Sequence, residues 1–147
     1  MRSVVKHLHL AVPAEAVWDI VGNVARIDWV PVITSCQLDG DVRTMQMTGV
    51  GTVQERILHR DAESMSLEYG LINNANVAVH KATLKVMAVG NGCELQWTTL
   101  IEPDALEPLI ESGMQSAIVA LCAAGCPLRH LSLTPNRSAP ACPAPRV

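Results

Sequence analysis

The fold is decided by residues 93–127, which read CELQWTTLIEPDALEPLIESGMQSAIVALCAAGCP. Up to residue 101, apolar and polar side chains alternate, which is typical of a half-buried β-strand. After Pro103 the period becomes 3.6, and Gly125 with Pro127 suits the end of a helix. The stretch therefore predicts a strand followed by one long helix near residues 104–124. The apolar stripe of that helix consists of Leu106, Leu109, Ile110, Met114, Ala117, Ile118, Leu121 and Cys122.

The same two-residue period recurs towards the N-terminus, in segments separated by turns rich in Gly, Asn and Asp. These segments predict an antiparallel meander of six strands, preceded by a first strand that ends at Pro13. Two short helices are expected between the first strand and the meander, at 13–22 and 27–30. The strands are expected at 4–12, 33–38, 42–48, 52–59, 65–72, 77–89 and 93–101.

Together these elements predict an α+β fold in which a curved antiparallel sheet of six to seven strands wraps around the long C-terminal helix. Such a sheet leaves a cavity between itself and the helix. We expect a single domain over residues 1–131. Residues 132–147 are rich in Pro and Ala and are expected to form a flexible tail.

Composition excludes several classes of protein. The chain has 147 residues, a net charge of −3 and a hydrophobic fraction of 49%, which does not fit a disordered protein. No basic stretch supports nucleic-acid binding, and no apolar run reaches the ~20 residues of a membrane span. Only three Trp and one Tyr are present, without any Phe, so base stacking is disfavoured as well.

The five cysteines contain no paired CxxC spacing, and the N-terminal apolar stretch is interrupted by charged and polar residues. We therefore expect a cytoplasmic protein without a signal peptide, with free and mostly buried thiols. Cys122, Cys126 and His130 are spaced by four, but Gly125 and Pro127 end the helix between them. No metal and no cofactor are expected.

Several short motifs occur in an order that carries a family resemblance: VPAEAVW (12–18), WVP (29–31) followed by SC (35–36), GTVQERI (51–57), LEY (67–69), and LQW (95–97) before Pro103. In this order the chain resembles the START/Bet v 1-like (SRPBCC) helix-grip superfamily, and within it the bacterial polyketide cyclase/dehydrase and lipid-transport branch. The resemblance covers residues 4 to about 124. It implies a cavity for a hydrophobic ligand, without fixing one function.

The resemblance also selects the face of each strand that turns into the cavity. Plant hormone receptors of this superfamily carry an inward glutamate at the position of Glu55. By strand alternation, Arg56 and Arg60 are expected on the opposite face of the same strand. The expected catalytic residues are Glu55, His80, Arg43 and Tyr69. The expected substrate-binding residues are Trp29, Met45, Met47, Trp97, Met114, Ile118 and Cys122.

Each polar candidate also has a structural interpretation. Glu55 and Arg43 could form an ion pair without a ligand role. His80 could be a core histidine with satisfied hydrogen bonds, and Tyr69 is favourable in a strand for its own sake. The tryptophans and methionines fit a core as well as a ligand wall.

Two functions remain open at this point, with a protein-interaction module as a weaker third. The first is an enzyme of the polyketide cyclase, aromatase or dehydratase type that acts on a hydrophobic oxygenated substrate. In it, Arg43 would stabilise an enolate or polarise a carbonyl, while Glu55, His80 and Tyr69 move protons. The second is a non-catalytic carrier of a lipid, sterol-like or phenolic ligand. The expected partner is a hydrophobic small molecule, and the sequence allows a homodimer.

Overall fold

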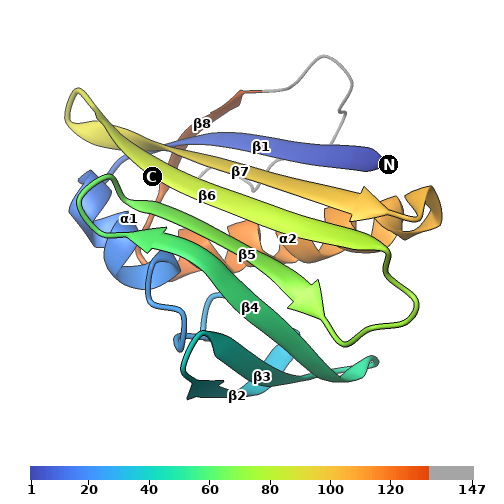
Figure 1. The fold of residues 1–147 in the computed structure, drawn as a ribbon. Helices are drawn as coiled ribbons and strands as arrows, with labels where there is room; N and C mark the ends of the chain where they lie inside the picture. The colour runs from blue at the N-terminus through green and yellow to red at the C-terminus, as the bar shows by residue number, and fades with distance from the viewer. Residues whose placement is uncertain (133–147) are drawn as a thin grey trace.

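One antiparallel sheet forms most of the structure (Figure 1). The computed structural model describes residues 1–132, and in them the strands lie in the order β2-β3-β4-β5-β6-β7-β1-β8. The strands are β1 (Arg2–Leu10), β2 (Ile33–Asp39), β3 (Val42–Met47), β4 (Gly51–Asp61), β5 (Ser66–Ile72), β6 (Val79–Val89), β7 (Gly92–Glu102) and β8 (Leu128–Ser132). Strands β2 to β7 form the expected meander, and β1 closes onto β7.

Helix α1 (Ala14–Val21) follows β1, and a 3₁₀ turn, η1 (Asp104–Leu106), leads into helix α2 (Glu107–Ala123). The two helices lie on the same side of the sheet, with α2 running along it behind the strands in Figure 1. Helix α1 begins directly after Pro13 and ends at Gly22, as the sequence predicts. This arrangement is the helix-grip fold, and the predicted fold class is confirmed.

Two elements differ from the prediction. The second short helix is a single turn, in which the Val30 N–H donates to the Ile27 carbonyl at 3.0 Å, because Pro31 stops any continuation. Strand β8 was not expected. It pairs with β1, which would otherwise be an edge strand, and it includes Ser132, the first residue of the predicted tail. The remaining tail, residues 133–147, lies outside the described residues.

The core forms where the inner face of the sheet meets the helices. Along β7, buried and half-buried residues alternate, and Leu95, Trp97 and Thr99 point inwards as the sequence predicts. Burying such side chains contributes about 1.5–3 kcal/mol each for the larger apolar ones. Apolar residues of α1 and of the C-terminal half of α2 complete the same cluster, including Val17, Val21, Ile118 and Leu121.

A largely buried ion pair connects α2 to the sheet. Lys6 of β1 is only 2% exposed, and its Nζ lies 3.1 Å from Oε2 of Glu111 on α2. The residues on either side of Lys6 along the inner face are apolar, namely Val4 and Leu8. A lysine in such surroundings requires a partner, because burying an unpaired charge is very costly.

Among residues 1–132, three cysteines are free, namely Cys36, Cys93 and Cys126. Cys122 is disulfide-bonded, so the expectation of free thiols throughout was wrong for this residue. The disulfide was not expected because the spacing of cysteines along a sequence does not show which thiols the fold brings within bonding distance.

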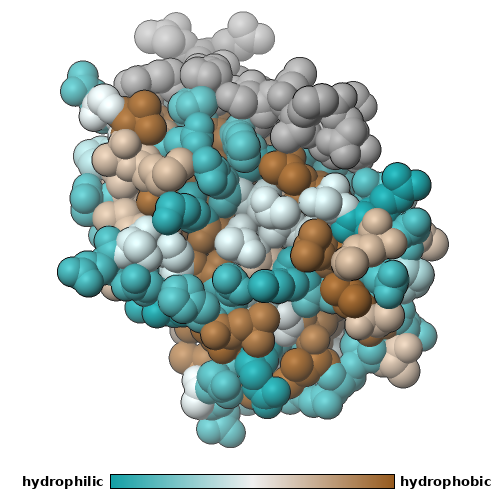
Figure 2. Space-filling view, turned by 45° about the horizontal axis from the view of Figure 1, so that its top comes forward, coloured by the Kyte–Doolittle hydropathy of each residue, from teal (hydrophilic) through white to brown (hydrophobic). Residues whose placement is uncertain are grey.

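The outer surface offers few large apolar groups. On the face seen in Figure 2, apolar side chains occur in small groups separated by polar ones. Within the described part of the chain, no helix is long and apolar enough to cross a membrane.

Candidate ligand cavity

A cavity of about 750 Å³ lies between the inner face of the sheet, α2 and the segment that follows α1. Most of its wall is apolar, and a few polar side chains reach into it from β3, β4, β5 and β6. All four polar candidates line this cavity, as do five of the seven expected wall residues: Arg43, Glu55, Tyr69, His80, Trp29, Met45, Met47, Trp97 and Met114.

Ile118 and Cys122 do not line the cavity, although both were expected to bind the substrate. Ile118 is 1% exposed and belongs to the packed core. Each step of four residues along a helix turns the side chain by about 40°. Along the row of residues four apart, Ile110 and Met114 therefore line the cavity, whereas Ile118 is turned into the core.

The sheet register brings Arg43 and Glu55 directly opposite each other on β3 and β4. Arg43 donates from Nε to Glu55 Oε1 at 2.8 Å, and its Nη2 lies 2.7 Å from the same oxygen. Both side chains are largely buried, at 13% and 11% exposed. Within the described residues, Glu55 Oε2 makes no hydrogen bond. Glu55 is therefore anchored by one oxygen and leaves the other as an acceptor for a ligand.

Arg43 is held from two further directions. Its Nη1 donates to the carbonyl of Val24 at 3.0 Å, and its guanidinium lies 4.7 Å from the centre of the Tyr69 ring. The cation–π contact and the three polar contacts fix the guanidinium in place. Arg43 thus neutralises and orients Glu55, and it links β3 to the segment after α1.

His80 stands where the β5–β6 ladder ends. Its Nδ1 accepts a hydrogen bond from the backbone N–H of Leu71 at 3.2 Å. The ring thus takes the place of the backbone carbonyl that would accept this hydrogen bond in a continuing strand pair. This hydrogen bond places the proton of the neutral ring on Nε2. Burial lowers the pKa of His80 from its ordinary value of 6.5, which keeps the ring neutral at pH 7. His80 thus presents an N–H donor from a neutral ring.

Tyr69 lies between these groups. Its ring centre is 6.3 Å from that of His80, and its face carries the Arg43 guanidinium. Burial, and secondly the nearby Glu55 charge, raise the pKa of Tyr69 far above its ordinary value. The hydroxyl therefore stays protonated and can donate a hydrogen bond to a ligand oxygen. Its neighbour in the wall, Trp97, packs against Trp29 with the two rings tilted by 55° and their centres 5.5 Å apart.

Residues 1–125 match the profile of the family described as polyketide cyclase / dehydrase and lipid transport. The chain belongs to this family. The match spans both helices and strands β1 to β7.

Solved structures with the same fold are distant in sequence from this family member. XoxI from Bacillus cereus is 21% identical, with a TM-score of 0.77, 84% of this chain covered and 95% of that one. Truncated norcoclaurine synthase from Thalictrum flavum is 18% identical, with a TM-score of 0.66 and coverages of 88% and 94%. The di-domain ARO/CYC BexL of the BE-7585A biosynthetic pathway is 16% identical, with a TM-score of 0.69; the match covers 82% of this chain and 45% of BexL. No curated protein matches the chain.

Sequence reasoning missed much of the cavity of this family member. The segment after α1 supplies a wall that has no periodicity to reveal it, and small polar residues also face the space. They could have been suspected only from general rules, such as the frequent role of polar loops in binding. The missed residues include Asn23, Arg26, Asn74, Asn76, Ser112 and Ser116.

A bulge in β4 corrects one further expectation. The register shifts between Ile57 and His59, so that Leu58 is the extra residue and Arg60 faces inwards, opposite Leu67. Simple alternation had placed Arg60 on the outer face with Arg56, because a bulge cannot be read from a two-residue period. Leu58 is 52% exposed as a result.

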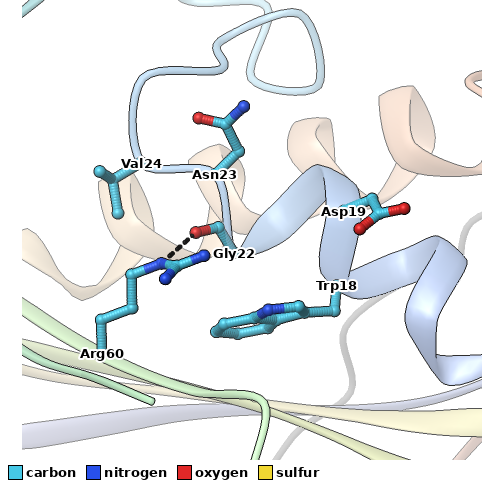
Figure 3. Close-up of a pocket in the computed structure, with 6 residues that line it drawn as sticks. All are labelled: Trp18, Asp19, Gly22, Asn23, Val24 and Arg60. Atoms are coloured by element: carbon cyan, nitrogen blue, oxygen red, sulfur yellow. Dashed lines mark hydrogen bonds between the residues drawn. The ribbon is translucent and has the colours of Figure 1, made fainter. Parts of the chain in front are cut away.

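The inward turn of Arg60 forms a second, shallower pocket of about 460 Å³, shown in Figure 3. Arg60 donates from Nε to the carbonyl of Gly22 at 2.7 Å, and its guanidinium lies 5.1 Å from the centre of the Trp18 ring. A Cβ atom on Gly22 would approach that ring to 2.5 Å, so the close packing requires glycine. Arg60 and Arg43 thus hold the carbonyls of Gly22 and Val24, and both fix the start of the segment that walls the cavity.

The state of His80 leads to a pH prediction for folding stability. Because its folded pKa is lowered, the unfolded chain binds more protons below pH 6.5. The contribution of His80 to stability is complete above this pH. It falls as the pH decreases from 6.5 to the lowered folded pKa, by up to about 1.4 kcal/mol per pH unit.

His80→Asn keeps an acceptor for the Leu71 N–H and does not titrate in this range. We expect the variant to lose less stability than the wild type between pH 6.5 and 5, measured by urea unfolding. The other histidines are common to both proteins and cancel in the comparison. Parallel curves for the two proteins would contradict the prediction.

Among the described residues, no group of three His, Cys, Asp or Glu side chains is placed to hold a metal ion.

Proposed function

We propose that the cavity takes up a hydrophobic oxygenated molecule and promotes its cyclisation or dehydration, as in polyketide cyclases and aromatases. The observation that carries the proposal is the convergence of Glu55, Tyr69 and His80 on a mainly apolar cavity, with one carboxylate oxygen uncommitted. A core without a function would favour apolar residues at these positions, since buried polar groups are costly.

The geometry supports an enolate mechanism. Glu55 Oε2 takes a proton from the carbon next to a ligand carbonyl, and the electron pair moves into an enolate. The enolate oxygen accepts hydrogen bonds from the His80 and Tyr69 donors, which stabilise the developing charge. Arg43 acts here as a positioning residue, because its own contacts are directed at Glu55, Val24 and Tyr69.

Dehydration and cyclisation then follow from one intermediate. In a β-hydroxy ketone, the enolate reforms the carbonyl while the β carbon–oxygen bond breaks, and the leaving hydroxide takes the proton from Glu55 and departs as water. In a chain with a second carbonyl, the enolate carbon attacks that carbon and closes a ring, and its new alkoxide takes the proton. The apolar wall holds the flexible chain in a reactive conformation, which removes part of the entropic barrier.

The test is a dehydration assay with 4-hydroxy-4-phenyl-2-butanone, whose product is a conjugated ketone with strong ultraviolet absorbance. We expect wild-type protein to form this product faster than buffer does. Binding of the ketone without any turnover would overturn the enzymatic proposal.

The alternative is a non-catalytic carrier of a lipid, sterol-like or phenolic ligand. The family description, which includes lipid transport, and the apolar wall support it. In either case we propose a cytoplasmic protein that works without a cofactor, and a homodimer is compatible with both functions.

A further inference from the structure

The ionised side chains that line the cavity are paired with partners of opposite sign. Within the described residues these are Arg26, Arg43 and Glu55. Arg26 donates from Nε and Nη2 to the carboxylate of Asp28, at 2.7 and 3.0 Å. Arg43 and Glu55 form the pair described above. The walls therefore contribute polar atoms but no uncompensated charge.

Beside the neutral amide and hydroxyl groups of the wall, the four polar candidates leave two kinds of atom for a ligand. Glu55 Oε2 is an acceptor that carries part of a negative charge, whereas His80 and Tyr69 offer N–H and O–H donors. The Arg43 charge is directed at Glu55, and its Nη1 at the Val24 carbonyl. A ligand group that reaches the buried wall of the cavity thus meets an acceptor and neutral donors.

We infer that the cavity selects electrically neutral oxygenated molecules, such as ketones, alcohols and phenols, and rejects carboxylates of the same shape. A carboxylate would lose its hydration on entry, would face the like-charged Glu55 Oε2, and would find no uncompensated cation. A hydroxyl can donate to Oε2, and a carbonyl can accept from His80 or Tyr69. This inference rests on the proposed function only in using the same cavity.

The test is isothermal titration calorimetry at pH 7 with two ligands of nearly equal shape, 2-acetylnaphthalene and 2-naphthoate. For wild-type protein we expect the ketone to bind at least about tenfold more tightly than the carboxylate. In Glu55→Gln, Arg43 is left as an uncompensated cation. We therefore expect naphthoate to bind at least about tenfold more tightly to this variant than to wild type, while the ketone changes by less than about threefold.

Two further variants complete the design. Glu68→Gln removes a carboxylate of a half-exposed ion pair on β5 and should leave both affinities unchanged. Arg43→Gln leaves Glu55 as an uncompensated anion, so naphthoate binding should weaken further and the cation 2-naphthylmethylamine should bind more tightly than to wild type. This variant keeps the inference testable if Glu55→Gln does not fold.

Equal affinity of wild type for ketone and carboxylate would overturn the inference, and so would binding of neither. An unchanged naphthoate affinity in folded Glu55→Gln would overturn it as well. These outcomes concern binding alone. Failure to dehydrate the β-hydroxy ketone would overturn the enzymatic proposal and leave the charge selection standing.

Discussion

Glu55→Gln is expected to lower the turnover of the β-hydroxy ketone by about a hundredfold or more, the effect of removing a proton-transfer group. The amide keeps the shape of the side chain, and its oxygen can still accept from Arg43. It cannot take a proton from carbon at neutral pH. Because the pair lies at the cavity wall, we expect the free energy of unfolding to change by less than about 2 kcal/mol, below the 3–5 kcal/mol of a broken fully buried pair.

The measurement combines the ultraviolet assay with urea unfolding of the same preparations. Glu68→Gln is the matched control, since it makes the same chemical change outside the cavity and should keep full activity. A large loss of stability with undiminished activity per folded molecule would show that Glu55 serves the fold.

Glu111→Gln should have the largest effect on stability, a loss of about 3 kcal/mol. It leaves the Lys6 ammonium, 2% exposed, without a counter-charge among apolar neighbours. The expected loss lies at the lower end of the range for a broken buried pair, because Glu111 is itself 23% exposed. The free energy of unfolding, from urea titration, is the quantity to compare.

Two controls separate charge burial from helix contacts. Glu68→Gln breaks the more exposed pair with Lys81 and should cost less than about 1 kcal/mol. The double variant Lys6→Met/Glu111→Leu removes both charges and should recover most of the stability. A double variant that is no more stable than Glu111→Gln would contradict this account.

The fold class could be predicted from the sequence because the patterns that indicate its strands and helices are local. Alternation predicted β2 to β7 to within a few residues, and prolines and glycines marked the helix ends. Strand β8 was missed, since its pairing with β1 joins residues about 120 positions apart and needs no distinctive pattern. Residues 27–30 were expected to form a helix because a segment of four residues is too short for its periodicity to distinguish a turn from a helix.

The cavity was predicted only in part, because some of its features are local in the sequence and others depend on strand pairing. Strand alternation and the family resemblance together placed Arg43, Glu55, Tyr69 and His80 on the inner face, and the structure puts all four at the cavity. Their roles remain predictions. The bulge at Leu58, which turns Arg60 inwards, depends on the pairing of two strands and has no signature in either strand alone.

The positions of the three tryptophans have a practical consequence for spectroscopy. Trp29 and Trp97 pack against each other at the cavity wall, whereas Trp18 packs against Gly22 in the separate pocket of Figure 3. In a Trp18→Phe protein, all indole emission would come from the two rings at the cavity. A ligand that enters the cavity would contact the wall that both rings form, so intrinsic fluorescence would report occupancy of the cavity without any label.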